Sequence, residues 1–330
     1  MNLYNPARNL GLALLAVFAL CTAAHAHEYS ALMKAKKVDE VDRATQAKLA
    51  TDANNADALM GRAEWLLNQG GEARVEEAIK LSERCVAAQP TRSECHEWVG
   101  NTMGTKAMSA GMFWLMGNAG KIRDAFKKAV ELDPKNLDAR FSLMQFYMQA
   151  PGVAGGGKDK AQALTAETTK VNADAAKLMQ GQLDLGDKDF AKAEATALAP
   201  LATDIAALQD QQRDLLVSVA NGQLREKHYA DATRLYAEIQ KRYPANEWGT
   251  YGMARTLQEQ GKHNDAIGWF EKSLAQKPGA HVHYRMAQCW QALSDKTKAI
   301  AAYERAIKFK PALSSKQRSD AEDQLKSLSS

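Results

Sequence analysis

One short loop has the residue spacing of a nucleotide-binding site. Gly152 is followed by four residues and then by Gly157 and Lys158, which is the GxxxxGK skeleton of a phosphate-binding loop. A functional loop of this kind follows a buried strand and places Ser or Thr after its lysine to hold magnesium. Here the preceding segment has the apolar spacing of a helix, and Asp159 follows the lysine. We therefore predict a long turn in which Pro151 ends one helix and Asp159 caps the next.

Histidines and cysteines offer routes to metal or redox chemistry. Cleavage before His27 would place its imidazole beside a free α-amino group, a pair that can chelate copper, although a disordered end is the plainer interpretation. His281 and His283 are close in sequence, but residues two apart on a helix do not share a face, so a metal site there is not expected. Cys85 and Cys95 could form a disulfide or remain buried thiols.

Signatures of the common enzyme classes are absent from the sequence. It contains no GxSxG elbow, no HExxH motif, no paired CxxC motifs and no glycine fingerprint after a strand. The 43 Lys and Arg residues nearly balance the 39 Asp and Glu residues, which argues against a nucleic-acid footprint or an electrostatic membrane surface. We expect a protein that is not an enzyme and that has no cofactor or resident metal.

The elements that position the functional side chains are predicted by an internal repeat. Three ladders of equivalent residues step by 34 and then 33 positions. Each repeat has a small residue, an aromatic residue four positions later and a proline twelve positions later. The small residues are Ala232, Ala266 and Ala299, the aromatic residues are Tyr236, Phe270 and Tyr303, and the prolines are Pro244, Pro278 and Pro311. This is the tetratricopeptide repeat (TPR) signature, in which alanine lets paired helices approach and the aromatic ring fills the space between them. The fold class expected is all-α, a TPR-type α-solenoid of stacked antiparallel helix pairs.

The N-terminal half carries the same pattern with insertions. Pro90 and Pro134 both end repeats, but 44 residues separate them. The surplus falls within residues 104–121, which we expect to lengthen a helix pair. The apolar side chains of this insertion are expected to pack in the core, with a partner-docking surface as the alternative: Met108, Met112, Phe113, Trp114, Leu115 and Met116.

A family resemblance covers roughly residues 56–161. The matching pieces are Cys95 to Trp98, the insertion, Lys121 to Pro134, and Ala150 to Ala161. This region resembles the repeat core of the regulator of microtubule dynamics family, and it also resembles exported bacterial TPR proteins with an AP-x-x-GGG-x-x-KA loop. The resemblance implies a helical-repeat interaction protein. A microtubule role does not transfer to an exported chain.

The first 26 residues have the features of a secretory signal peptide. Arg8 precedes the apolar run LGLALLAVFALC, and Ala24 and Ala26 supply the A-x-A pattern, so we expect cleavage before His27. The apolar run is too short to span a bilayer. We expect a periplasmic protein with no stable membrane insertion after cleavage.

Function in a TPR array is expected on the groove formed by the first helices of successive pairs. The side chains projected onto that groove are Asn221, Trp248, Tyr251, Arg255, His281, Tyr284, Arg285 and Gln288. Aromatic rings beside arginines suit an extended peptide or a chain terminus, with packing between repeats as the alternative role. Asn221 and Arg285 fall where carboxylate-clamp TPR proteins carry equivalent residues, but Val217 and His281 stand where that clamp carries lysines.

These observations predict a non-enzymatic periplasmic scaffold or adaptor that binds protein or peptide partners and no nucleic acid. The alternative is a metal or redox accessory protein that uses His27 or the cysteines. The expected organisation is a signal peptide (1–26), an N-terminal segment with a leading helix (27–55), TPR-like repeats with insertions (56–212), three regular TPR repeats (213–312) and a polar capping helix (313–330). The oligomeric state is not predicted.

Overall fold

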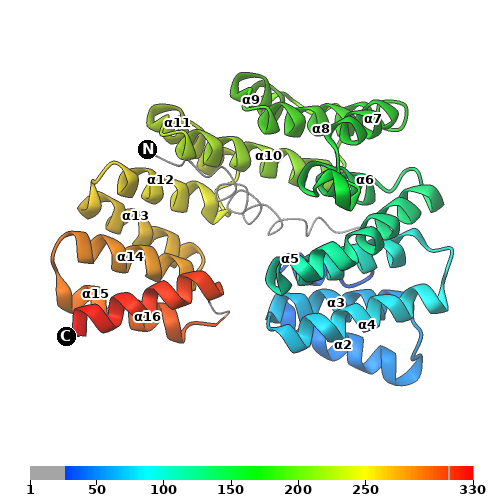
Figure 1. Ribbon diagram of the computed structural model, residues 1–330, viewed down its shortest axis with the longest axis horizontal. Helices are drawn as coiled ribbons and strands as arrows, with labels where there is room; N and C mark the ends of the chain where they lie inside the picture. Colours follow the sequence, from blue (N-terminus) through cyan, green and yellow to red (C-terminus); the bar gives the residue numbers. More distant parts are fainter. Residues whose placement is uncertain (1–26, 311–312, 330) are drawn as a thin grey trace, which may run out of the picture. The chain divides into compact units, whose positions relative to one another are not determined.

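A computed structural model of the protein describes residues 27–310 and 313–329, most of which are helical (Figure 1). These residues form sixteen α-helices and one short 3₁₀ helix, and the described part of the chain contains no strand. The predicted all-α helical-repeat fold is confirmed. The expected signal peptide, residues 1–26, and Pro311 lie outside the described residues. Within those residues, no helix combines the length and apolar character needed to cross a membrane.

The chain divides into two compact units. Unit 1 contains the described residues up to Gly186 together with Pro200–Gln211, and unit 2 contains Asp187–Ala199 and the described residues from Gln212 onward. The helices of unit 1 are α1 (Ser30–Lys34), α2 (Val38–Thr51), α3 (Ala56–Gln69), α4 (Glu72–Ala88), α5 (Ser93–Leu132), α6 (Leu137–Gln149), the 3₁₀ helix η3 (Gly152–Ala154), α7 (Lys158–Thr168) and α8 (Ala173–Gly186). Those of unit 2 are α9 (Phe190–Leu198), α11 (Tyr229–Arg242), α12 (Glu247–Glu259), α13 (His263–Gln276), α14 (Ala280–Ala292), α15 (Lys296–Lys308) and α16 (Ser315–Ser329), and α10 (Ala206–Arg225) contributes residues to both units.

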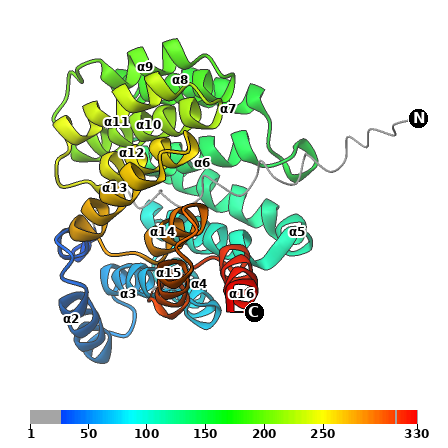
Figure 2. The ribbon, with the colours of Figure 1, turned by 90° about the vertical axis from the view of Figure 1, so that its left-hand side faces the viewer.

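Consecutive helices of unit 2 pack against each other in chain order, as an α-solenoid requires. Contacts link α11 to α12 and continue helix by helix to α16, and Figures 1 and 2 show this succession. The ladder alanines are fully buried, and the ladder aromatics are at most 1% exposed: Ala232, Ala266, Ala299, Tyr236, Phe270 and Tyr303. Gly252 allows the close approach of α12 to α11, because a Cβ atom at residue 252 would lie 2.1 Å from the ring of Tyr236. The small and aromatic residues that define the repeat therefore form its core, as predicted.

Side-chain caps fix where several helices begin. Each capping side chain accepts a hydrogen bond from a backbone N–H group of the first turn, and the caps are Asn55 of α3, Asn136 of α6, Asp189 of α9, Asn246 of α12 and Asp295 of α15. Such a bond satisfies one of the N–H groups that have no partner within the helix. Since α3, α6 and α12 are first helices of their pairs, these caps help to set which residues face the groove.

Cys85 and Cys95 form a disulfide that joins α4 to α5 in unit 1. Both residues are fully buried in a core cluster that also includes Leu59 and Trp98. Cys289 is a buried free thiol in unit 2, and burial raises its pKa to about 12. The structure thus selects the disulfide between the two alternatives that the sequence left open.

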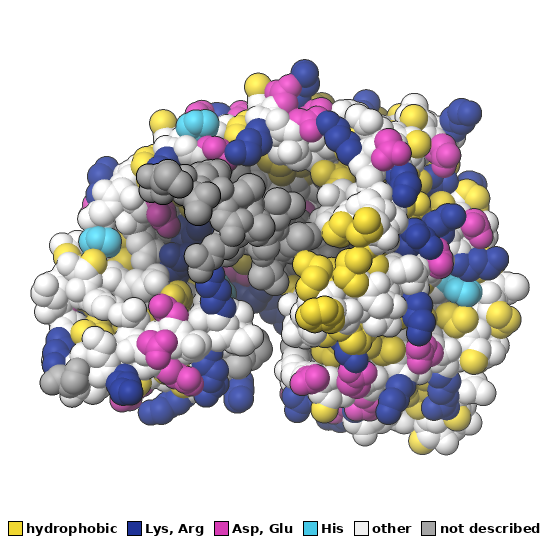
Figure 3. Space-filling view, in the orientation of Figure 1, with side chains coloured by type: hydrophobic (Ala, Val, Ile, Leu, Met, Phe, Trp, Pro, Cys, Tyr) yellow, Lys and Arg dark blue, Asp and Glu magenta, His cyan; other side chains and the backbone are white. Residues whose placement is uncertain are grey.

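The insertion at residues 104–121 lengthens a helix pair, as expected, but its apolar side chains are not core. α5 contains both helices of the pair, and Gly111 interrupts it with φ 81° and ψ 172°. Beside this turn, Phe113 is 98% exposed and Met112 is 49% exposed, while Met108 and Met116 are also exposed. Trp114 is half-buried beneath the ammonium group of Lys106, 4.9 Å from the ring centroid. Figure 3 shows hydrophobic side chains gathered on the surface over α5. The prediction of a buried stripe was wrong for the four exposed side chains, because they flank the turn at Gly111 and remain exposed to solvent.

The glycine loop is a turn between two helices. α6 precedes it, so the strand that a phosphate-binding loop requires is replaced by a helix. Gly155 and Gly157 adopt φ values of 90° and 147°, which favour glycine. The ammonium group of Lys160 donates hydrogen bonds to the carbonyl groups of Gly155 and Gly156, so it closes the loop. One detail of the prediction was wrong: the N-cap of α7 is Gly157, and Asp159 lies within the first turn.

Candidate functional site: a polar pocket in unit 2

The first helices of two pairs in unit 2, α12 and α14, place the predicted groove residues in equivalent positions. The second, fifth and ninth residues of each helix are Trp248, Tyr251 and Arg255 in α12, and His281, Tyr284 and Gln288 in α14. Residues spaced by three and four positions lie on one helix face. The repeat therefore aligns these six side chains on the same face of two neighbouring helices, which are in contact.

One end of this face is an aromatic cluster. The His281 ring stacks on Trp248 with a centroid distance of 6.3 Å and meets the edge of Tyr251 at 4.9 Å. Tyr251 is only 7% exposed and packs against the core ring of Phe270. Burial lowers the pKa of His281, and the positive charges of Lys277 and Arg285 lower it further. This end of the face is therefore a rigid hydrophobic platform with a neutral imidazole.

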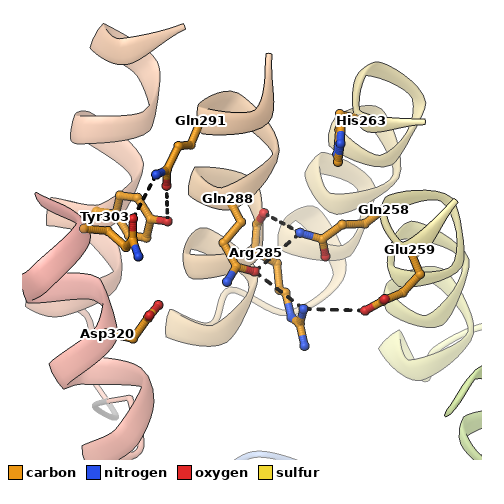
Figure 4. Close-up of a pocket in the computed structure, with 9 residues that line it drawn as sticks. Gln258, Glu259, His263, Arg285, Gln288, Gln291, Tyr303 and Asp320 are labelled. Atoms are coloured by element: carbon orange, nitrogen blue, oxygen red, sulfur yellow. Dashed lines mark hydrogen bonds and ion pairs between the residues drawn. The ribbon is translucent and has the colours of Figure 1, made fainter. Parts of the chain in front are cut away.

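The other end of the face opens into a polar pocket of about 390 Å³. Its lining comes from α12, α14 and α16, with single residues at the start of α13 and in α15: Gln258, Glu259, His263, Arg285, Gln288, Gln291, Tyr303, Asp320 and Gln324 (Figure 4). Arg285 and Gln288 were predicted as groove residues. The remaining lining residues were not predicted.

A chain of hydrogen bonds fixes the centre of the pocket. The amide of Gln258 donates to the Arg285 carbonyl oxygen at 3.3 Å and to Oε1 of Gln288 at 3.4 Å. The amide of Gln288 donates to the Tyr284 hydroxyl at 2.9 Å, and that hydroxyl donates to Asp320 at 2.5 Å. Burial and the bond to Asp320 raise the pKa of Tyr284 to about 12. The phenol is therefore a neutral link between α14 and α16 at physiological pH.

A second set of hydrogen bonds fixes the far wall. The Tyr303 hydroxyl donates to Oε1 of Gln291 at 2.8 Å, and the amide of Gln291 donates to Gln324 at 2.8 Å. Tyr303 is a ladder aromatic whose ring is buried, so the core of the repeat orients a polar group at the pocket. α16 is thus more than a polar cap, because it supplies two side chains of the lining.

Three buried polar atoms of the pocket residues have no hydrogen-bond partner in the protein. They are Nε of Arg285, Oε1 of Gln258 and Nδ1 of His263. Nη1 of Arg285 lies 3.9 Å from Glu259, at the limit of an ion pair. An unsatisfied buried polar atom lowers stability by about 1–3 kcal/mol, so such atoms are unusual unless they meet a ligand or water.

A glutamine ladder went unnoticed in the sequence. Gln258, Gln291 and Gln324 recur at intervals of 33 residues, the period of the core ladders. The same period that places alanine and aromatic residues in the core places these amides on the pocket wall. The signal is present in the sequence alone, because these glutamines share the period of the small and aromatic residues.

One predicted groove residue, Asn221, also contributes to the packing of the repeats in unit 2. Asn221 accepts a hydrogen bond from the hydroxyl of the core residue Tyr236 at 2.8 Å. Val217, which stands at a clamp position, is 2% exposed. Arg255 is partly buried, and its Nε has no hydrogen-bond partner. The groove assignment of these residues remains a prediction.

The described residues contain no cluster of three or more His, Cys, Asp or Glu side chains arranged to hold a metal. His27 is not a disordered end: its side chain is fully buried, with Nε2 2.9 Å from a carboxylate oxygen of Glu64. His281 and His283 have different surroundings, since His283 lies against Phe309. They do not share a face, as the spacing predicted.

Comparison with known proteins relates this arrangement to the tetratricopeptide repeat. Two tetratricopeptide repeat families match the sequence, one over residues 223–289 and the other over residues 280–313. The structure is similar to yeast Tom70, with a TM-score of 0.57 and 13% identity over 84% of this chain and 57% of that chain. It is also similar to human IFIT1, solved as a dimer with m7Gppp-AAAA, with a TM-score of 0.52 and 17% identity over 87% of this chain and 67% of that one. No curated protein matches the sequence significantly. The chain thus spans little more than half of the Tom70 structure, and these similarities support a TPR protein at the level of fold.

Proposed function

We propose that the protein is a non-enzymatic, exported TPR scaffold whose unit 2 binds an extended peptide segment of a partner protein. The TPR fold is generally a scaffold for protein–protein interaction. A stacked helical array keeps its face rigid, so that a partner loses conformational entropy on binding while the scaffold loses little. The proposed peptide-binding site is the pocket between α12, α14 and α16.

The observation that carries this proposal is the set of pocket groups that match a peptide. Four glutamine amides line the pocket: Gln258, Gln288, Gln291 and Gln324. Each amide can both donate and accept, as a peptide group does. The guanidinium of Arg285 can form two parallel hydrogen bonds with a carboxylate, and its Nε is buried without a partner. The proposed ligand is therefore an extended peptide with a carboxylate, either a side chain or the C-terminus.

Two observations support export to the periplasm as part of this proposal. The first is the sequence pattern of residues 1–26, which is typical of a signal peptide. The second is the Cys85–Cys95 disulfide, since structural disulfides form and persist mainly in oxidising compartments. Cell fractionation combined with N-terminal sequencing tests this part. The expected result is a periplasmic protein that begins at His27, whereas an intact chain in the cytoplasm would contradict it.

Selection from a library of random peptides with free C-termini tests peptide binding. We expect enrichment of peptides that carry a carboxylate, and weaker binding when the selected peptide has that carboxylate removed by amidation. Arg285→Ala should weaken binding by about tenfold or more, because a hydrogen bond to a charged group contributes about 1.5–3 kcal/mol. The matched control is Arg242→Ala, which removes an arginine of the same unit that pairs with Glu238 on α11 and does not line the pocket.

The proposal would fail if the folded wild-type protein enriched no peptide, or if Arg285→Ala and Arg242→Ala had the same effect on affinity. Circular dichroism of each variant would establish that the helices remain intact. A selected peptide that binds Arg285→Ala as tightly as wild type would move the site elsewhere.

A further inference from the structure

The first described residues of the chain are buried against the first helices of unit 1. His27 is 2% exposed and Tyr29 is 6% exposed. The contacts of residues 27–30 indicate what this face of unit 1 recognises.

The ring of Tyr29 packs on α3 at a position where only glycine leaves enough space. A Cβ atom at Gly61 would lie 2.7 Å from Cδ2 of the Tyr29 ring, so any larger residue would displace the ring. The ring packs in a hydrophobic cluster with Val41 of α2 and Ala58 of α3. The shape of α3 at this point is complementary to an aromatic side chain.

The side chain of His27 binds at a second position, between α3 and α5, beside the carboxylate of Glu64. Its Nε2 atom lies 2.9 Å from Glu64 of α3, and its ring lies 5.7 Å from the ring of Trp98 on α5. Its Nδ1 atom accepts a hydrogen bond from the backbone N–H of Tyr29 at 3.3 Å, which holds the two rings in a fixed relation. The carboxylate of Asp57 on α3 is paired with Arg92, and the backbone of Glu28 lies near enough to help lower the pKa of that carboxyl. The side chains of His27 and Tyr29 are thus both held.

The residues that hold this segment occupy groove positions of the repeat. Asp57 and Glu64 are the second and ninth residues of α3. The second and ninth residues of α12, in unit 2, are Trp248 and Arg255, which the sequence assigned to the groove. The N-terminal segment therefore lies on α3 where a TPR groove would bind a peptide.

We propose that the α3–α5 face of unit 1 is a second peptide-binding site, occupied by the chain's own residues 27–30 and open to partner peptides that carry an imidazole and a tyrosine ring two residues apart. The bound segment is an intramolecular ligand. A partner must displace it, so the site is inhibited in the free protein. This proposal does not depend on the pocket of unit 2.

Tethering explains why the site would be masked. A ligand joined by a short linker has an effective concentration in the millimolar range, so a free peptide of micromolar affinity must compete with it. Weakening the two anchors should expose the site without removing any residue of α3 or α5. The variant for this purpose carries His27→Ala and Tyr29→Ala in the otherwise complete chain.

The probe is a synthetic peptide of sequence HEYSALMKAKK, which reproduces residues 27–37 and carries a fluorophore at its C-terminus. Fluorescence anisotropy should show that the double variant binds this peptide about tenfold or more tightly than wild type does. A control peptide, AEASALMKAKK, lacks both anchors and should not bind. Adding Gly61→Ala to the double variant should abolish binding, because the added methyl group fills the space that the tyrosine ring occupies.

Equal binding by wild type and the folded double variant would overturn the proposal, as would binding that Gly61→Ala leaves unchanged. If the double variant does not fold, hydrogen exchange of the wild type and of the single Gly61→Ala variant decides. The amides of residues 29–34 should exchange at least tenfold faster in Gly61→Ala. Unchanged protection of these amides would show that the contact of Tyr29 with Gly61 does not hold the segment.

Discussion

The two units present the same helical positions with opposite chemistry. In unit 1, the second and ninth residues of α3 are Asp57 and Glu64, and they hold the chain's own residues 27–30. In unit 2, the equivalent residues of α12 are Trp248 and Arg255, and the face continues into a pocket lined by amides. An acidic face holds an internal segment, and an aromatic and amide-rich face opens into a pocket.

This difference separates the roles of core and surface in a repeat. The core ladders require only that alanine and aromatic residues recur with the correct period. Groove positions such as the second and ninth residues of α3 and α12 are less constrained by that packing, so each repeat can carry different recognition chemistry on a similar backbone. The two faces are therefore expected to bind different peptides, and the following variants test how far they are independent.

The largest expected effect concerns the aromatic core beneath the face of unit 2. Phe270→Ala removes a fully buried ring that supports Tyr251. We expect the free energy of unfolding to fall by about 3–5 kcal/mol, measured by urea denaturation. Phe113→Ala is the control, since that ring is 98% exposed, and its effect should stay within about 0.5 kcal/mol. Similar losses for the two variants would contradict the assignment of core and surface.

The next effect concerns the disulfide of unit 1. Replacing Cys85 and Cys95 with serine removes a cross-link between residues ten positions apart. A closed loop of this size contributes about 2–3 kcal/mol to stability in the chain-entropy model. Urea denaturation should show that loss, and hydrogen exchange should place it in α4 and α5. A loss spread equally over α12 to α14 would show that the two units do not unfold separately.

A smaller effect is expected from the hydroxyl that links α14 to α16. Tyr284→Phe keeps the ring but removes the hydrogen bonds to Asp320 and Gln288. We expect stability to fall by about 2 kcal/mol, because two hydrogen bonds are lost and each usually contributes about 1 kcal/mol. Peptide affinity should also fall, because α16 supplies part of the pocket. If thermal unfolding and peptide affinity were both unchanged, the link would have no role in shaping the pocket.

The contributions of the two faces to stability should also change over different ranges of pH. Burial lowers the pKa of His281 below its ordinary value of 6.5, so the unfolded chain binds the proton first as the pH falls. The stability that the neutral imidazole contributes is present above about pH 6.5 and is lost below it. Burial opposes ionisation of Asp57, but hydrogen bonds and charge from Arg92 lower its pKa below 3.8, so its contribution is lost only below that pH.

Unfolding free energies of wild type, His281→Gln and Asp57→Asn across this pH range test that difference. His281→Gln should reduce the loss of stability between pH 7 and pH 5, while Asp57→Asn should change the profile only near pH 4 and below. Partial burial also lowers the pKa of His283, so part of the loss near pH 6 should persist in His281→Gln. A His281→Gln profile that matches wild type would contradict burial of a neutral imidazole.

The fold could be predicted because its core obeys one period. Ala266, Phe270 and their equivalents recur every 33 or 34 residues, and each is buried as the pattern requires. The insertion in α5 was placed correctly, but the exposure of Phe113 was only the alternative to the buried stripe that we expected. Periodicity shows that an apolar segment is helical, whereas burial depends on whether another element covers it. No local pattern contains that information.

The candidate site could be predicted only in part. Arg285 and Gln288 line the pocket, because groove positions follow from helical register. Asp320 was not foreseen, because it comes from the terminal helix, whose polar sequence indicated a cap. The packing of Tyr29 on Gly61 could not be predicted either, because it is a contact between segments about thirty residues apart. Such contacts arise from tertiary packing and leave no spacing to detect.

Hydrogen exchange of the wild-type protein, with and without a library-selected peptide, locates the open peptide site. New protection is expected in α12, α14 and α16, where the pocket residues lie, with no change in α3 or in residues 29–34. Protection confined to α13 and α15, or to α3 and α5, would contradict the assignment of the open peptide site to unit 2.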